Sequence, residues 1–159
     1  WSRKAQTRQR NWAAMNKDIE NREDIDELMR AFYKRAITDD VIGFIFTDIA
    51  KLDLEHHLPI IGDFWETLLF RTGDYSRHGR NPLQVHGDLN EKTPLRRAHF
   101  TGWVEIFTQK VDRKFAGDTA EFIKMRAGAI AERMLEFVGG DLAIDSQGDG
   151  AAVPLRRHG

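Results

Sequence analysis

Four side chains in this chain could hold a metal and a ligand bound to it: His86, Tyr33, His57 and Trp103. His86 follows the helix-start signal of residues 81–83, Asn-Pro-Leu. Tyr33 and His57 lie on two predicted helical faces before it, and Trp103 lies on one after it. Haem iron needs an axial base from the protein, and the polarity of the opposite face decides the fate of a bound ligand. One imidazole facing three hydrogen-bond donors therefore predicts a haem pocket.

Helical periodicity supplies the elements that must position these residues. Apolar residues recur at three- and four-residue steps, and the sequence lacks strand alternation of useful length. We predict helices from about Asn21 to Ala36, from Leu54 to Phe70, a short one from Asn81-Pro82 to near Gly87, a long one opened by Thr93-Pro94 to about Phe115, and a last one from Asp118 to Gly139-Gly140.

The last predicted helix has two further features in its sequence. Glu121 follows Asp118 at the spacing of a capping box, in which two side chains satisfy backbone N–H groups at the helix start. Its buried face is predicted to consist of the larger apolar residues, Phe122, Met125, Ala129, Ile130, Met134 and Phe137. The exposed face then carries Lys124, Arg126, Glu132 and Arg133.

Composition bounds the class of protein. The chain has 159 residues, 41% of them hydrophobic, which is enough for one core. Its 24 basic and 25 acidic residues nearly cancel, so no overall field favours nucleic acid or an anionic membrane. The absence of cysteine excludes disulfides, thiolate haem ligation and iron–sulfur clusters. No apolar run has the length of a membrane span, and we expect a soluble, cytoplasmic protein.

The chain is predicted to contain a single domain with two polar ends. Residues 1–20 form a polar N-terminal extension, disordered or partly a tag, to which we assign no function. Residues 21–140 form the helical domain. Residues 141–159 are small, polar and glycine-bearing, which is typical of a disordered tail.

Seven short fragments resemble group III truncated haemoglobins in type and order. The similarity covers roughly Ile25 to Phe137 and implies an all-α, globin-like fold, a two-over-two helical sandwich around haem b, in a bacterial protein. The fragments are Phe32-Tyr33, Ile45-Phe46, His57-Leu58-Pro59, Phe64-Trp65, Gly73-Asp74-Tyr75, Pro82-Leu83-x-x-His86 and His99-Phe100-x-x-Trp103.

The resemblance implies a role for each candidate residue. His86 is similar to the proximal iron ligand, Tyr33 to the distal tyrosine, His57 to the distal-helix histidine and Trp103 to the distal tryptophan. Pro59 removes a helical N–H two residues after His57, so the imidazole could also swing out as a gate.

Elementary chemistry supports these roles. O2 on ferrous haem is partly charge-separated, so phenol, indole and imidazole donors stabilise it. Each donor contributes about 1 kcal/mol or more in a dry pocket. Leu83, one turn before His86, is expected to press on the haem from the side of the iron ligand. Apolar walls that exclude water are expected from Phe46, Ile61, Phe64, Trp65 and Phe100.

Other side chains offer alternatives for the same roles. His56 is expected on an exposed face, yet a shift of one residue would make it the distal histidine. His99 shares a helical stripe with Trp103 and could compete for iron, although the resemblance favours a supporting role. Arg77 or Arg80 could pair with a haem propionate, or could belong to a solvated loop.

Several functions fit such a pocket. Several donors hold O2 tightly, which suits chemistry on the bound ligand, such as nitric oxide dioxygenation or peroxide reduction, with an external reductase. The alternative is storage, scavenging or sensing of O2, NO, CO or anionic ligands such as cyanide and sulfide without turnover. A third class is a helical interaction protein without haem. We expect a monomer or a weak homodimer.

Overall fold

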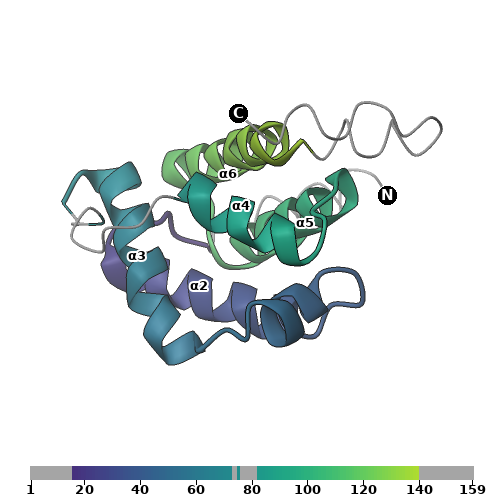
Figure 1. The fold of residues 1–159 in the computed structure, drawn as a ribbon. Coiled ribbons are helices and arrows are strands. Elements are labelled where there is room, and N and C mark those ends of the chain that lie inside the picture. The colour runs from purple at the N-terminus through teal and green to yellow at the C-terminus, as the bar shows by residue number, and fades with distance from the viewer. Residues whose placement is uncertain (1–15, 73–74, 76–81, 140–159) are drawn as a thin grey trace, which may run out of the picture.

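The structure is a computed structural model that describes residues 16–72, 75 and 82–139, with only the backbone at 83 and 84 (Figure 1). The described residues are helical and contain no strand. None of their helices is both long and apolar enough to cross a membrane. The elements are α2 (Arg22–Ala36), the π-helical turn η1 (Ile45–Ile49), α3 (Leu54–Phe70), α4 (Pro82–Lys92), α5 (Arg97–Lys114) and α6 (Asp118–Val138).

Two pairs of helices form the body of the domain. α2 packs against α3, α5 packs against α6, and the contact between α2 and α5 joins the two pairs. Figure 1 shows α2 and α3 on one side of the molecule and α5 and α6 on the other, with α4 resting against α6. This arrangement confirms the predicted all-α, two-over-two sandwich.

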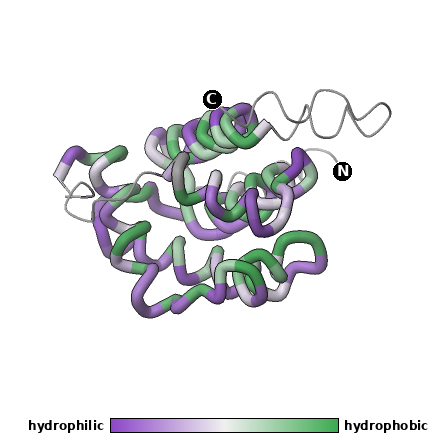
Figure 2. Tube along the Cα trace, in the orientation of Figure 1, coloured by the Kyte–Doolittle hydropathy of each residue, from purple (hydrophilic) through white to green (hydrophobic). Residues whose placement is uncertain are grey.

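The helices are amphipathic, as Figure 2 shows by the mixing of hydrophilic and hydrophobic residues along each of them. In α2 the side chain of Asn21 accepts a hydrogen bond from the backbone N–H of Asp24 and so caps the first turn. One face of α2 is buried along the whole helix and includes Phe32 and Tyr33. That face forms much of the hydrophobic core. The helices α5 and α6 add Phe107, Val111, Ile123 and Leu135 to it.

The short helix before the loop to α5 is longer than predicted. α4 passes Gly87 and ends at Lys92, and α5 begins at Arg97 rather than at Pro94. Asn90 explains part of the difference, because its side chain accepts from the backbone N–H of Leu95 and stabilises a non-helical connection. Both predicted boundaries were therefore wrong by several residues.

The buried face of α6 also differs from the prediction. Phe122, Met125 and Phe137 are exposed by 41%, 56% and 46% of their surfaces, and Met134 alone of the predicted face is buried. The helix instead buries a stripe rich in alanine, in which small side chains let α6 approach its neighbours closely: Ala120, Ile123, Ala127, Ala131, Leu135 and Val138.

The start of α6 is capped from outside the helix. Asp18 accepts hydrogen bonds from the backbone N–H groups of Thr119 at 2.9 Å and Ala120 at 2.8 Å. Gly117, with a φ of 140°, makes room for this carboxylate, since a Cβ there would lie 2.5 Å from it. The predicted capping box is wrong at this position. Ile19 is buried, so residues 18–20 pack with the helical domain.

Asp18→Ala is expected to lower the free energy of unfolding by about 1–2 kcal/mol at pH 7. Burial raises the pKa of Asp18, but the backbone hydrogen bonds outweigh it and lower that pKa below 3.8. Its contribution is therefore complete above pH 3.8 and is lost as the pH falls through the folded-state pKa. Urea denaturation as a function of pH measures the difference, which should vanish in acid; a difference that persists there would contradict the assignment.

Arg22 fastens α3 to α2. Its guanidinium donates to the carboxylates of Asp63 at 2.6 Å and Glu66 at 2.7 Å, and to the carbonyl of Pro59 at 3.2 Å. Gly62 permits this approach, because a Cβ there would lie 2.6 Å from the guanidinium. The contact holds the helix that carries His57 against the helix that carries Tyr33.

Arg22→Met is expected to lower the free energy of unfolding by about 2 kcal/mol, because it leaves the buried Asp63 without this charged donor. Arg133→Met, on the exposed side of α6, is the matched control and should change little. Chemical denaturation of both variants measures the difference. Equal stabilities would show that the Arg22 contacts add nothing.

Candidate functional site

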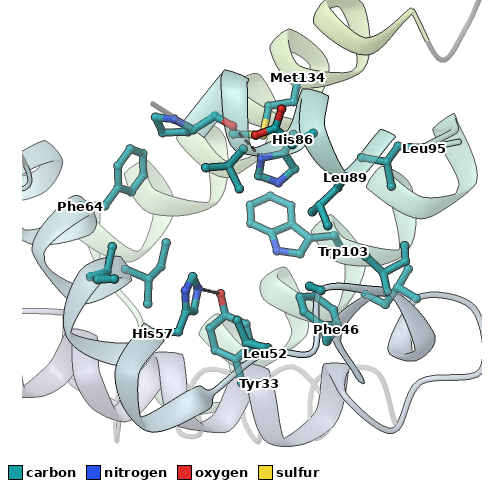
Figure 3. A pocket seen from close by; sticks show the side chains of 18 of the residues that line it. Tyr33, Phe46, Leu52, His57, Phe64, His86, Leu89, Leu95, Trp103 and Met134 are labelled. Atoms are coloured by element: carbon teal, nitrogen blue, oxygen red, sulfur yellow. Dashed lines mark hydrogen bonds between the residues drawn. The ribbon is translucent and has the colours of Figure 1, made fainter. Parts of the chain in front are cut away.

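An apolar cavity of about 480 Å³ lies between the two helix pairs, bounded by α2, η1, α3, α4, α5 and α6. Its volume falls within the range typical of ligand and cofactor sites. All four residues singled out as chemically active line it: Tyr33, His57, His86 and Trp103. Figure 3 shows His86 on one side of the cavity and the Tyr33–His57 pair on the opposite side.

His86 is oriented by the first turn of its own helix. Its Nδ1 lies 2.8 Å from the carbonyl oxygen of Pro82. Because a carbonyl only accepts, Nδ1 carries the proton and Nε2 keeps its lone pair. Burial lowers the pKa of His86, and the hydrogen bond to Pro82 only partly offsets this. A neutral imidazole with a free Nε2 has the chemistry of an iron ligand.

Tyr33 and His57 form a hydrogen-bonded pair. The hydroxyl of Tyr33 lies 2.8 Å from Nε2 of His57, and their rings meet edge to face. Tyr33 is almost fully buried, which raises its pKa and keeps the phenol neutral. His56 is exposed at the edge of the cavity, so the structure brings His57 rather than His56 to Tyr33. The helix continues through Pro59 without losing this alignment.

Trp103 is held by a ladder of aromatic rings. It stacks on Phe107 at 5.5 Å, and Phe107 stacks on Trp65 at 5.4 Å. Phe32 meets Trp103 edge to face at 6.0 Å. These contacts fix the indole at the cavity wall.

The predicted apolar walls lie around the cavity. Phe46 meets Tyr33 edge to face at 5.8 Å, and Phe100 lies against His86 at 6.4 Å. The π-helical turn η1, closed by a bond from Ala50 N–H to the carbonyl of Ile45, places Phe46 there. Ile61, Phe64 and Trp65 line the α3 side, while the side chain of Leu83 lies outside the described residues.

His99 supports its helix. Its Nδ1 accepts a hydrogen bond from the backbone N–H of Arg96 at 3.0 Å, so the neutral ring carries its proton on Nε2. Burial and the nearby Arg96 lower the pKa of His99 and favour this neutral form. A ring in this tautomer has no lone pair left for iron, which agrees with the predicted supporting role.

The prediction missed several residues of the site. Lys51 and Lys92 line the cavity beside Asp53 and Asp88, whereas Arg77 and Arg80 lie outside the described residues. The missed residues on α4 recur from Val85 at helical three- and four-residue steps. A prediction that extended this helix past Gly87 would have included them. The apolar lining residues missed are Ile42, Ile45, Ala50, Leu52, Ile60, Pro82, Val85, Leu89, Leu95, Ile130, Ala131 and Met134.

Comparisons with known proteins agree with this geometry. A scan against protein-family models finds no match. The chain is 32% identical over 126 residues to the group 3 truncated hemoglobin ctb of Campylobacter jejuni, covering 76% of this chain and 94% of that protein. It also superimposes on the crystal structure of the group III truncated hemoglobin from Campylobacter jejuni with a TM-score of 0.68 and 29% identity, covering 78% of this chain and 95% of that one. The chain belongs to the group 3 truncated haemoglobin family.

Proposed function

We propose that this protein binds haem b in the cavity, with His86 as the axial iron ligand. Membership of the globin family implies haem binding. The observation that carries the proposal is the free Nε2 of His86 facing, across an apolar cavity, the hydrogen-bonded pair of Tyr33 and His57. The iron supplies the position at which O2, NO, CO or a small anion binds.

Tyr33, His57 and Trp103 act on the bound ligand as donors. The phenol of Tyr33 stays protonated, and when its hydroxyl turns toward a ligand, Nε2–H of His57 can donate to the phenol oxygen. The half-buried His57 can then pass protons between solvent and Tyr33. The surrounding apolar side chains exclude water, which strengthens each of these hydrogen bonds.

Lys51 and Lys92 are proposed to hold the carboxylates of the haem. Both line the same cavity as His86, and an ammonium group pairs well with a propionate at the edge of a pocket. The same role predicted for Arg77 or Arg80 stays a prediction, because both lie outside the described residues.

We propose redox chemistry on the bound ligand as the activity. Three donors slow the release of O2, so the ligand stays long enough to react. In nitric oxide dioxygenation, O2 and NO combine to nitrate and each turnover consumes one electron from an external reductase. Peroxide reduction consumes two electrons in the same way. The second candidate is non-catalytic binding of O2, NO, sulfide or cyanide, which the same donors would also support.

One experiment separates these two candidates. The O2 dissociation rate is measured by displacement with CO, and the oxygenated protein is then mixed with NO in a stopped-flow spectrometer. Decay much faster than O2 release, with nitrate as product, is the expected result. Decay limited by O2 release, without nitrate, would leave ligand binding as the function.

A further inference from the structure

A basic groove lies between α2 and α5, outside the cavity. It encloses about 1280 Å³ and is lined by six basic and three acidic residues, although the whole chain has a net charge of −1. The basic residues are Arg30, Lys34, Arg35, Lys110, Arg113 and Lys114, and the acidic ones are Glu23, Asp26 and Glu27.

Most of the positive charge in the groove is left unneutralised. Glu27 pairs with Lys114 at 3.2 Å, and Asp26 is occupied by Arg22, which lies outside the groove. Arg35 pairs with Asp39. Among the described ion pairs none involves the remaining four cations, Arg30, Lys34, Lys110 and Arg113.

Two pairs of these cations lie at helical spacings at which like charges repel each other. Arg30 and Lys34 lie four residues apart on α2, and Lys110 lies three residues before Arg113 on α5. Like charges at such spacings repel by about 0.2–0.5 kcal/mol per pair. An anionic partner seated in the groove would remove this repulsion.

The groove lies directly behind the donor side of the cavity. Tyr33 lines the cavity and its neighbour Lys34 lines the groove, so α2 alone separates the two at this point. The diameter of an α-helix with side chains is about 10–12 Å. On α5, Lys110 follows Phe107 by one turn, and Phe107 stacks on Trp103, which lines the cavity. A partner in the groove is therefore close to the haem site.

We propose that this groove docks an acidic electron-donor protein. The inference rests on the proposed function, which needs an external reductase. One electron passes from the donor's reduced flavin or iron–sulfur centre to the ferric iron, so the donor is oxidised by one electron and the iron becomes ferrous. Three carboxylates among the cations give the groove a mixed pattern that suits a protein face better than a polyphosphate.

The experiment uses the haem-loaded full chain and reduced flavodoxin, an acidic flavoprotein, as the probe. Calorimetry measures the binding of oxidised flavodoxin to the ferric protein, so that no electron is transferred. Stopped-flow absorption then measures the rate at which reduced flavodoxin reduces the haem at 20 and 300 mM salt. The test variant Lys34→Glu/Lys110→Glu reverses one charge on each side of the groove. The matched control, Arg126→Glu/Arg133→Glu, reverses two charges on α6.

We expect the groove variant to bind flavodoxin at least about tenfold more weakly than the wild type at low salt, and its haem to be reduced at least about tenfold more slowly. Both differences should shrink at high salt. The control should behave like the wild type, and the CO spectra of all three should be the same. Equal rates in both variants would overturn the docking proposal. So would groove-dependent binding of duplex DNA or phosphatidylserine vesicles with no binding of flavodoxin.

The two proposals fail separately. A protein without a haem spectrum would refute the proposed function before any docking is measured. A protein that shows the haem spectrum, is reduced by dithionite and reacts with CO, but whose flavodoxin kinetics ignore the groove charges, would refute only the docking surface.

Discussion

Replacing His86 by alanine is expected to abolish stable haem binding. The Nε2 lone pair of His86 is the proposed ligand to the iron, and the carbonyl of Pro82 holds the ring in the tautomer that this role requires. Loss of a supporting hydrogen bond to a metal ligand alone costs about 10–100-fold in affinity, so loss of the ligand should accelerate haem release by more than about 100-fold. Transfer of haem to an excess of apomyoglobin, followed by absorption, measures the rate.

Free imidazole and a second histidine variant make this result specific. Added imidazole should occupy the space left in His86→Ala and restore the spectrum of the wild type. His56→Ala is the matched control, because His56 is exposed at the edge of the same cavity. Equal haem release from His86→Ala and the wild type would show that another residue binds the iron.

Tyr33→Phe is expected to raise the O2 dissociation rate by about tenfold or more. The substitution removes a buried hydroxyl whose proposed hydrogen bond to bound O2 is expected to contribute roughly 1.4 kcal/mol, and it leaves the ring contacts with Phe46 in place. Flash photolysis and CO displacement measure the rate. Tyr75→Phe is the matched control, since Tyr75 is the only other tyrosine of the chain and also lines the cavity.

The pair formed with His57 makes a second, sharper prediction. Tyr33→Phe and His57→Leu should not be additive, because each variant breaks the same 2.8 Å hydrogen bond. The O2 dissociation rate of the double variant should therefore be about the same as that of the single variant that releases O2 faster. Additive effects, or an unchanged rate in Tyr33→Phe, would mean that the hydroxyl does not reach the ligand.

The sequence predicted the bounds of those helices whose start and end signals lie in the helix itself or next to it. The bounds of α3 match the prediction at both ends, and α2 begins at Arg22, one residue after the predicted start at about Asn21. The end of α6 at Gly139, with a φ of 72°, follows from a backbone conformation that favours glycine. The error at the start of α6 arose because a distant residue decides it: Asp18 caps α6 from about a hundred residues away, and no sequence window contains both partners.

Side-chain size misled the prediction for α6. Weighting large apolar residues points to the face of Phe122 and Met125, but close packing between helices selects the alanine stripe around Ala127. The site was more predictable, because its residue types are themselves the signal. His86, Tyr33, His57 and Trp103 all line one cavity. The tautomer of His86 depends on a carbonyl four residues earlier, and the pairing of Tyr33 with His57 needs the tertiary fold.

The most direct test of the account is the visible absorption spectrum of the purified protein, first ferric, then reduced with dithionite, then under CO. We predict a Soret band that shifts on reduction and again to the six-coordinate carbonyl form, with one haem per chain. The same series on His86→Ala should lose or alter the band. A protein with no Soret band after haem is added would contradict the haem site and every function proposed for it.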